Sequence, residues 1–541
     1  MSQRFLGANP EKSAQQGCYF TEIQVVAIIF LVTVLSSFCC TKAYATDYFV
    51  SASGSDDNGN GTLSKPWRTL RFACTQISAD QGHTIKVGAG VFVELQVLVP
   101  TGVNIIGAGR DQTILKADPS FYHYPADPGY SHDKLLICLT SNALAEGNQS
   151  IKDLTIDGDG KKLHGGIIIK NRTNVLVKRI KIQNTNFTGI WLWEVKDSRV
   201  TEIVLKDCAW GSAGWSSGTI DLANLERVEI DHVTVDEGFG NGIKSLGTNG
   251  QMHYLKVHDN RISVVPNGQW KTTSGDNAPN IAFELWNVDM LGCELYNNYI
   301  DNTISLVMDE EPWRIPKQTA TTIHVYNNLI DLESRARGNG YAMEVSVHNI
   351  EIDHNYILKG QHGIVNWDNK GTLMSNWNIH HNIFYGIADV YPAEILRAQH
   401  SGLHNVKFYN NTVEFSGTRT TNLIAIYGGT SENVEIKNNL VINSNTSYNF
   451  YPNQIIHLEN GTLTNLEVAS NFLCNQPLDN VQGTIRNNLS GDPKIRKVGG
   501  RPIPYYLPVT GSPVIDSGIN VGLPFAGSAP DIGAHETFFH N

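Results

Sequence analysis

Three ionisable residues stand at equivalent places in successive short strands, and their types suit the cleavage of a sugar chain. Aligning the apolar residues of these strands places Asp221, Lys244 and Glu284 side by side, each pointing outward. The inward positions in this alignment are Ile190, Ile220, Ile243, Phe283, Leu306, Met343, Ile364 and Ile395. The row could equally be a salt-bridge ladder on a solvated face, because opposite charges on adjacent strands attract one another.

The lysine of this row suits one kind of polysaccharide cleavage, β-elimination. In that reaction a base removes the proton α to a uronate carboxylate, while a cation neutralises the acid. A lysine whose surroundings lower its pKa can serve as the base. The sequence therefore predicts Lys244 as the catalytic base of a lyase.

The carboxylates of the row suit a second kind of cleavage, glycoside hydrolysis. Glu284 and Asp309 are predicted on neighbouring strands, offset by about two residues, which places them roughly 8 Å apart. That separation lies within the range of about 6.5–9.5 Å found between the carboxyl groups of inverting glycosidases. Glu344, one strand further along, could replace either of them.

Aromatic residues accompany the charged row and suggest a surface for sugar rings. Trp191, Trp193 and Trp286 fall in the same stretch, and Arg397 is predicted on the same face. Indole rings stack on sugars, whereas a solvent-facing tryptophan without a ligand exposes apolar surface. We expect these four residues, together with Asp221, to bind the substrate.

The elements that position these residues are repeats of about 28 residues. Six segments read apolar-x-Asn/His-Asn-x-apolar, as in Leu295–Ile300 and Val325–Ile330. The second Asn of the motif recurs at positions 298, 328, 355, 382, 411 and 439, so the gaps are 30, 27, 27, 29 and 28 residues. Each repeat contains two or three short strands with a period of two, and only stacking of successive repeats can bury their apolar faces. The recurring Asn is expected to form an inward hydrogen-bonded ladder without a catalytic role, because a buried amide needs partners.

These repeats predict an all-β fold, a single right-handed parallel β-helix with a cap at each end. Residues 1–45 are interpreted as a signal peptide, with an apolar run at Val25–Leu35 and a cleavage site at Ala43-Tyr44-Ala45. An uncleaved membrane anchor is the alternative. Residues 46–100 are assigned to an N-terminal cap and the first strands, with a short helix near Thr69–Ile77. Residues 101–490 are assigned to the coils, and 491–541 to a C-terminal cap rich in Pro and Gly.

Both ends of the predicted solenoid carry recognisable motifs. Tyr48-Phe49-Val50-Ser51 with Ser53-Gly54-Ser55-Asp56 resembles the start of exported pectate-lyase-like β-helix proteins. Gly511-Ser512-Pro513-Val514-Ile515-Asp516 and Asp531-Ile532-Gly533-Ala534-His535-Glu536 are similar to the tail of the same group. The resemblance implies the fold, but not the reaction, because this scaffold carries lyases, hydrolases, epimerases and adhesins.

One internal stretch has a more local resemblance. Val235–Lys244 is similar to the calcium-and-lysine segment of family nine polysaccharide lyases, although Asn241 stands where that family has Asp and Lys244 comes earlier than the usual base. The resemblance implies a Ca²⁺ ion held by Asp231, Asp236 and Glu237. Acidic residues before a Gly are also ordinary turn formers.

The overall charge narrows the choice of partners. The net charge is −11. This charge argues against nucleic acid as a partner, because a protein surface that binds nucleic acid is basic. We therefore expect a polysaccharide partner, export to the cell surface or medium, no membrane span after cleavage of the signal peptide, and a monomer. The predicted function is a lyase acting on a uronate-containing polysaccharide. An inverting glycoside hydrolase and a non-catalytic glycan-binding adhesin are the alternatives.

Overall fold

A computed structural model describes most of the chain after residue 44. The described residues are 45–120, 135–160, 163–209, 218–238, 240–246, 250–264, 281–308, 323–332, 340–366, 374–387, 392–400, 402–416, 420–444, 453–478, 481–496 and 506–537. The chain divides into two units, Met1–Ala45 and Thr46–Asn541. The predicted signal peptide thus falls outside the described residues except for Ala45. Within the described part, no helix is long and apolar enough to span a membrane.

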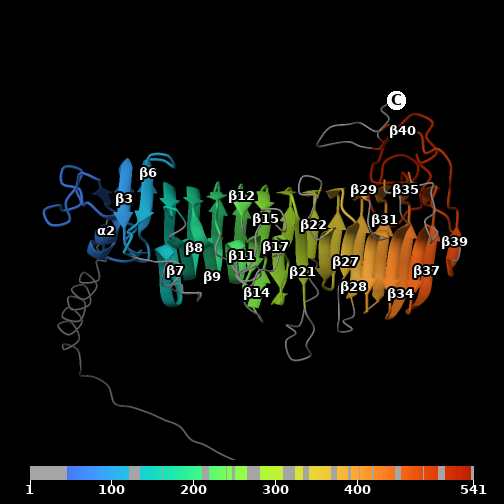
Figure 1. The fold of residues 1–541 in the computed structure, drawn as a ribbon, viewed down its shortest axis with the longest axis horizontal. Helices are drawn as coiled ribbons and strands as arrows, with labels where there is room; N and C mark the ends of the chain where they lie inside the picture. Colours follow the sequence, from blue (N-terminus) through green and yellow to red (C-terminus); the bar gives the residue numbers. More distant parts are fainter. Residues whose placement is uncertain are drawn as a thin grey trace, which may run out of the picture. The chain divides into compact units, whose positions relative to one another are not determined.

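Unit Thr46–Asn541 is a right-handed parallel β-helix, as the repeats predict (Figure 1). Strands of one coil pair in parallel with the equivalent strands of the next coil, about 4.8 Å away. The pairings run along three series of strands, which we call ladders A, B and C. The long strands β7 (Leu135–Asp157), β8 (Leu163–Gln183), β9 (Thr185–Thr201) and β11 (Gly218–Asp231) turn corners and so contribute to more than one ladder.

Ladder A carries the predicted site. Besides parts of the long strands it contains β4 (Val97–Leu98), β13 (Asn241–Ser245), β17 (Ile281–Trp286), β21 (Thr303–Val307), β24 (Tyr341–Ser346), β27 (His362–Asn366), β30 (Ala393–Gln399), β33 (Thr421–Tyr427) and β36 (Gln454–Glu459).

Ladders B and C form the remaining sides of each coil. Ladder B contains β1 (Asp47–Val50), β2 (Thr84–Val87), β5 (Asn104–Gly107), β15 (Lys256–His258), β19 (Glu294–Tyr296), β22 (Ile323–Tyr326), β25 (Ile350–Asp353), β28 (Met374–His380), β31 (Leu403–Tyr409), β34 (Thr430–Lys437), β37 (Thr462–Ala469) and β39 (Thr484–Arg486). Ladder C contains β3 (Gly90–Glu94), β6 (Thr113–Ala117), β10 (Val204–Lys206), β12 (Thr234–Gly238), β16 (Arg261–Val264), β20 (Tyr299–Ile300), β23 (Leu329–Asp331), β26 (Tyr356–Leu358), β29 (Ile383–Ile387), β32 (Thr412–Phe415), β35 (Leu440–Asn443) and β38 (Phe472–Cys474). Short pairings join β14 (Gly250–His253) to β18 (Val288–Asp289), and β40 (Ile495–Arg496) to β41 (Leu507–Pro508), the latter antiparallel.

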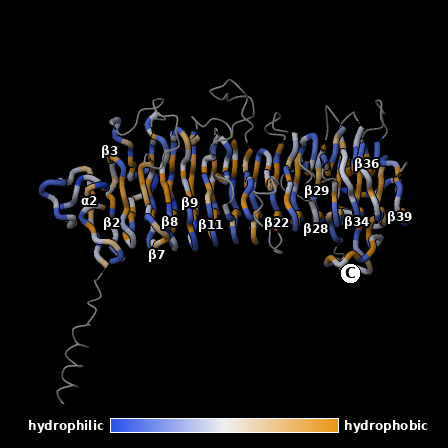
Figure 2. Tube along the Cα trace, turned by 90° about the horizontal axis from the view of Figure 1, so that it is seen from below, coloured by the Kyte–Doolittle hydropathy of each residue, from blue (hydrophilic) through white to orange (hydrophobic). Residues whose placement is uncertain are grey.

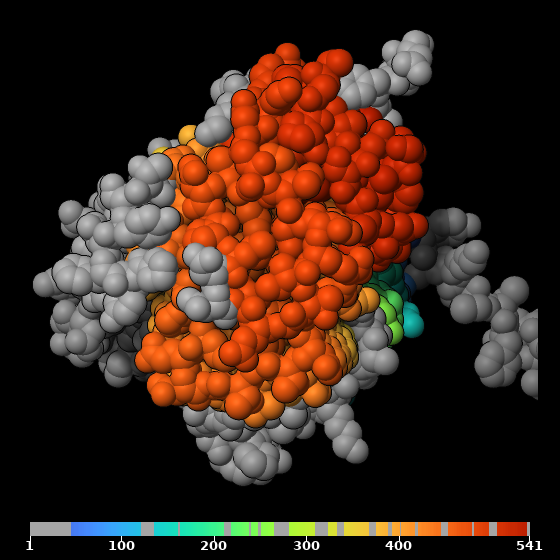
Figure 3. All heavy atoms as spheres, turned by 90° about the vertical axis from the view of Figure 1, so that its right-hand side faces the viewer, coloured from blue at the N-terminus to red at the C-terminus, as the bar shows by residue number. Residues whose placement is uncertain are grey.

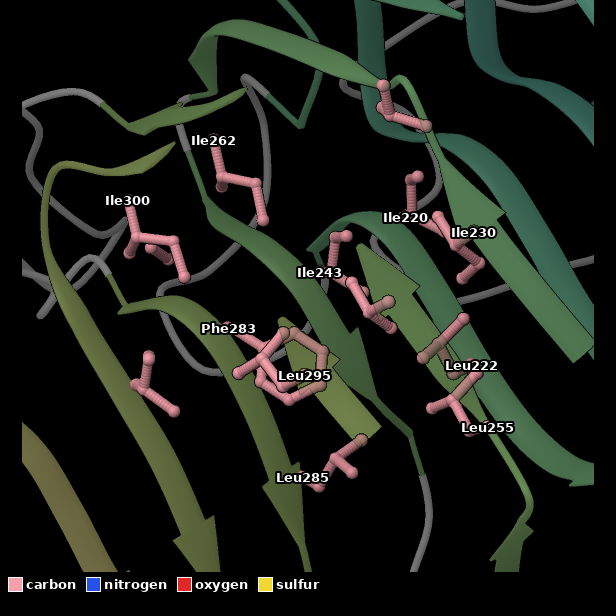
Figure 4. Close-up of a cluster of buried hydrophobic side chains, with 14 of the residues drawn as sticks. Ile220, Leu222, Ile230, Ile243, Leu255, Ile262, Phe283, Leu285, Leu295 and Ile300 are labelled. Carbon is pink, nitrogen blue, oxygen red and sulfur yellow. The ribbon is translucent and has the colours of Figure 1, made fainter. Parts of the chain in front are cut away.

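The core lies inside the coils, where alternate residues of all three ladders meet. Figure 2 shows hydrophobic and hydrophilic segments alternating along the coils. In Figure 4, Ile243 and Phe283 of ladder A point toward Leu295 of ladder B and Ile262 of ladder C. All four side chains are nearly or fully buried. Burial of such side chains stabilises each coil by about 1.5–3 kcal/mol per residue, and no single coil could bury them alone.

A buried asparagine ladder follows ladder B at one corner of the coils, and this confirms the prediction from the repeats. Within it, the side-chain oxygen of Asn382 accepts hydrogen bonds from the backbone nitrogen of Asn355 at 3.0 Å and from its side-chain nitrogen at 3.0 Å. The side-chain nitrogen of Asn382 donates to the carbonyl of Ile352 at 2.8 Å. The same pattern joins Asn260, Asn298, Asn328, Asn355, Asn382, Asn411, Asn439, Asn471 and Asn488.

The N-terminal part contains α2 (Leu70–Gln76), close to the predicted helix. Its first turn is held by Glu94, whose carboxylate accepts from the backbone nitrogens of Leu70 at 2.6 Å and Arg71 at 3.1 Å. Burial raises the pKa of Glu94 to about 7, although these two hydrogen bonds oppose the shift.

The C-terminal segment 506–537 packs against the side of the last coils. Figure 3 shows these red residues lying against the orange coils. The contact includes hydrogen bonds from Asn410 to the carbonyl of Asp531 at 3.0 Å and from Asn438 to the carbonyl of Ile519 at 2.8 Å. The segment therefore covers part of the corner that follows ladder B.

Candidate functional site

The outward row predicted from the sequence lies on ladder A. Backbone pairing places the following residues in register on successive strands: Trp191, Asp221, Lys244, Glu284, Ser305, Glu344, Val365 and Arg397. The register predicted for Trp191, Asp221, Lys244 and Glu284 is confirmed. Two later strands differ from the alignment: Ile304 replaces Leu306 as the inward partner of Phe283, and Leu396 replaces Ile395 as the partner of Ile364.

Lys244 and Glu284 form a buried ion pair at the centre of the row. The ammonium nitrogen of Lys244 contacts Oε2 of Glu284, and each side chain is only 5% exposed. The side-chain nitrogen of Asn241 donates to the same carboxylate oxygen at 3.0 Å. The side-chain oxygen of Asn241 accepts a hydrogen bond from the backbone nitrogen of Ile281 at 3.1 Å. Two donors thus fix the orientation of Glu284, since a buried charge is tolerated only with such partners.

Asp221 lies beside Lys244 but is fully buried, so the expected substrate contact of Asp221 is not what the structure shows. Its Oδ1 accepts from the backbone nitrogen of Gly218 at 2.6 Å. Burial raises the pKa of Asp221 well above its ordinary value, against the opposing effects of the Gly218 hydrogen bond and the Lys244 charge. Asp221 is therefore a buried neighbour of Lys244 in the row and offers no surface to a ligand.

A pocket of about 450 Å³ opens over the middle of the row. Its lining consists of Lys244, Ile281, Glu284, Trp286, Ser305, Val307, Tyr341 and Glu344. The sequence alignment predicted Lys244, Glu284, Trp286 and Glu344 for the site but missed Ser305 and Tyr341. Ser305 was missed because the alignment placed Val307 at its position in the row.

Glu344 is the second carboxylate that lines this pocket. Ser305 donates a hydrogen bond to Oε2 of Glu344 at 2.7 Å. Burial raises the pKa of Glu344, the hydrogen bond from Ser305 lowers it, and the charge of Glu284 raises it further. The strand β21 separates Glu284 on β17 from Glu344 on β24, so two carboxylates in different environments flank one pocket.

The predicted tryptophans divide between the pocket and a neighbouring cluster. Trp286 lines the pocket and is 43% exposed. Trp191 is 6% exposed and stacks on Trp193, with ring centres 5.5 Å apart, in a cluster with Cys138 and Ile168. Burial in this cluster leaves Trp191 little surface for a sugar, whereas Trp193 is half-buried.

Arg397 lies on the same row, four strands beyond Glu284. A guanidinium nitrogen of Arg397 is 2.9 Å from Oε2 of Glu394, and the guanidinium carbon lies 4.5 Å from the centre of the Tyr427 ring. The hydroxyl of Tyr427 donates to Oε1 of Glu394 at 2.5 Å. Sequence reasoning missed Glu394 and Tyr427. Arg397 therefore belongs to a packed polar cluster at a distance from the pocket.

Asp231 and Asp236, two of the three carboxylates expected to hold Ca²⁺, lie on different sides of the coil. Asp231 lies on ladder B, where Arg199 donates to its two oxygens at 2.8 and 2.9 Å. Although burial opposes it, these hydrogen bonds, with those of His232 and Thr201, lower the pKa of Asp231 to about 2. Asp236 lies on ladder C, and its carboxylate is 3.5 Å from the ammonium of Lys206.

These two residues do not fit a shared calcium ion, because their oxygens serve cationic partners on different sides of the coil. The side chain of Glu237 lies outside the described residues, and so does Asp309, the predicted hydrolytic partner of Glu284.

Known structures resemble this fold at low identity. No family model matches the sequence, and no curated protein matches it. A tailspike protein of E. coli bacteriophage HK620, solved in complex with a pentasaccharide, is 14% identical over 77% of this chain and 78% of its own, with a TM-score of 0.49.

Two carbohydrate-active enzymes are also similar. The catalytic unit of the GH87 α-1,3-glucanase from Streptomyces thermodiastaticus is 13% identical over 77% of this chain and 67% of its own (TM-score 0.43). Pectate lyase Pel9A is 12% identical over 91% of this chain and 96% of its own (TM-score 0.33).

Proposed function

We propose that this protein is an extracellular enzyme that cleaves a polysaccharide in the pocket over β17, β21 and β24, by hydrolysis with Glu344 as the proton donor. The observation that carries the proposal is the contrast between its two carboxylates. Glu284 is held by an ammonium and an amide, whereas burial and a neighbouring negative charge raise the pKa of Glu344. Pairs of carboxyl groups whose surroundings separate them in this way divide the acid and base roles of glycosidases.

The separation of the two residues suits an inverting reaction. Two strand spacings put their backbones about 9.6 Å apart, so their carboxyl groups can reach the separation of about 6.5–9.5 Å found in inverting glycosidases. Glu344 donates its proton to the glycosidic oxygen as the bond to the anomeric carbon breaks. A water molecule attacks that carbon from the opposite face and gives its proton to Glu284.

The rest of the pocket would orient the sugar. Trp286 offers a half-exposed indole face, and its backbone nitrogen is fixed by a 2.8 Å hydrogen bond to the hydroxyl of Ser245. An aromatic face of this kind packs against the C–H surface of a pyranose ring. The polysaccharide chain would then run along ladder A, with successive sugars over successive strands.

β-Elimination is the second candidate, and the position of Lys244 favours it. Lys244 lines the same pocket and contacts Glu284 directly, so a proton passed to that carboxylate would leave an amine able to remove the α proton of a uronate. The geometry ranks this reaction below hydrolysis, because in the structure Lys244 is the partner that orients Glu284.

The products distinguish the two reactions. We would incubate the full chain with a panel of neutral and uronate polysaccharides, and record both reducing ends and absorbance near 235 nm, which reports only the double bond made by elimination. For hydrolysis we expect reducing ends without an absorbance rise, lost in Glu344→Gln and Glu284→Gln by about 100-fold or more. Glu432→Gln, at a half-exposed glutamate of ladder B, is the control and should keep full activity.

Other outcomes reassign the pocket. An absorbance rise that disappears in Lys244→Ala would establish the lyase and reject hydrolysis. Binding of one polysaccharide without either product would reject both reactions and support a glycan-binding role.

A further inference from the structure

The corner that follows ladder B changes composition at two adjacent coils. Asp353 at the end of β25 pairs in register with His380 at the end of β28. The next residues, His354 and His381, both have φ of 53°. In four other coils this left-handed position is held by asparagine, namely Asn297, Asn327, Asn410 and Asn438. Asparagine adopts this conformation readily, so the two histidines are not required by the turn.

The four side chains face one another across the two coils. Nδ1 of His354 is 2.6 Å from Oδ2 of Asp353, and Nδ1 of His380 is 2.9 Å from Nδ1 of His381. The rings of His354 and His381 stack in parallel, with centres 5.0 Å apart. One ligand atom each from Asp353, His354 and His380 can be chosen so that all three lie within 4.8 Å of one another.

We infer that Asp353, His354 and His380 form a binding site for one divalent transition-metal ion of the zinc class. Zinc takes imidazole nitrogens and carboxylate oxygens at about 2.0–2.2 Å in a tetrahedral arrangement. The ligand atoms must therefore approach one another somewhat, and the exposed ring of His354 can turn to allow this. His324 contacts the other oxygen of Asp353 and would orient that carboxylate as an outer partner.

A second cluster with similar residue types shows why this one is favoured. Glu229, Asp231 and His258 also lie within 4.8 Å through one ligand atom each. There, both oxygens of Asp231 already accept hydrogen bonds from Arg199. A fixed guanidinium repels a divalent cation, and no Lys or Arg contacts Asp353 among the hydrogen bonds and ion pairs of the described residues. The second cluster therefore provides a control.

The site would join two coils and is independent of the pocket on ladder A. A metal ion bound only by the folded chain stabilises it by mass action. Ile383, two residues after His381, packs with Tyr506 and Ala534 of the C-terminal segment, so the metal would sit where that segment meets the coils. We therefore expect zinc to raise the thermal midpoint without changing cleavage of polysaccharide.

The test is zinc titration of the chelator-treated full chain by calorimetry, with Co²⁺ absorption as a probe of coordination. His354→Asn and His380→Tyr introduce the residue types found at the same places in neighbouring coils, so both variants should fold. We expect one equivalent of zinc to bind the natural chain, and each variant to weaken binding by about 10-fold or more. His258→Asn should leave it unchanged.

Each contrary result overturns the inference. Absence of zinc binding to the natural chain would reject the site. Unchanged affinity in both His354→Asn and His380→Tyr would place any bound zinc elsewhere, and loss of binding in His258→Asn would place it at the second cluster.

Discussion

The buried ion pair between Lys244 and Glu284 leads to a prediction about stability that does not depend on the substrate. Replacing Lys244 with Met keeps most of the side-chain volume but leaves the Glu284 carboxylate, only 5% exposed, without its cation. Breaking a buried pair in this way costs about 3–5 kcal/mol. The hydrogen bond from Asn241 remains, so we expect a loss near the lower limit, about 3 kcal/mol.

A double-mutant cycle separates the pair from its surroundings. In Lys244→Met combined with Glu284→Gln both charges are absent, while Asn241 can still donate to the new amide. We therefore expect the double variant to lie within about 1 kcal/mol of the natural protein, since uncharged groups of similar volume often replace a buried pair at little cost. The coupling energy should then be at least about 2 kcal/mol.

The assay is urea unfolding followed by circular dichroism and tryptophan fluorescence, whose transitions must coincide for a two-state treatment. Lys86→Met is the matched control, because Lys86 pairs with Asp47 while both side chains are about half exposed. That variant should lose less than about 1 kcal/mol. A loss from Lys244→Met no larger than that of the control would refute the buried pair, and with it the proposed orientation of Glu284.

Three further predictions concern the first coils, the corner and the pocket. Because the pKa of Glu94 is raised to about 7, its stabilising contribution is complete below pH 4.5 and is lost as the pH rises through 7. Compared with Glu94→Gln, the natural chain should therefore lose up to about 3 kcal/mol of unfolding free energy across that interval, measured by urea titrations at several pH values. Asn382→Ala removes five side-chain hydrogen bonds from a buried corner and should cost about 3–6 kcal/mol in the same assay, whereas Asn376→Gly, at an exposed left-handed position, should cost less than about 0.5 kcal/mol. Trp286→Ala should weaken polysaccharide binding by about 10-fold while changing stability by less than about 1 kcal/mol, as followed by calorimetry and urea unfolding.

The fold could be predicted because its signal repeats. From Asn260 onward, each coil has a left-handed corner residue followed by a buried asparagine, and the doubled asparagines make both features visible in the sequence. The three ladder members that escaped the prediction are less conspicuous. Asn260 follows Asp259 and Asn471 follows Ser470, so the doubled motif is absent there, and Asn488 lies only 17 residues after its partner.

The site could be predicted only on those strands where the apolar pattern fixed the register. On β21, Ile304 and Leu306 are both apolar and two residues apart, so two alignments with the same inward face fit equally well. On β30, Ile395 and Leu396 are adjacent, which leaves the inward face itself ambiguous. The burial of Asp221 and the pairing of Lys244 with Glu284 depend on the directions of side chains between coils. The spacing of residues along the sequence does not reveal these directions.

The asparagine ladder also bears on how such a chain can change during evolution. Consecutive members are between 17 and 38 residues apart, yet their side-chain hydrogen bonds all measure 2.9–3.1 Å. The hydrogen-bond geometry at the corner therefore does not depend on the number of residues between two consecutive asparagines of the ladder. Since doubling a flexible loop costs only about 0.6 kcal/mol in closure entropy, segments could be inserted or exchanged between strands without loss of the scaffold. New ligand specificities could thus arise by recombination of the inserted segments, while the asparagine ladder keeps the coils in register.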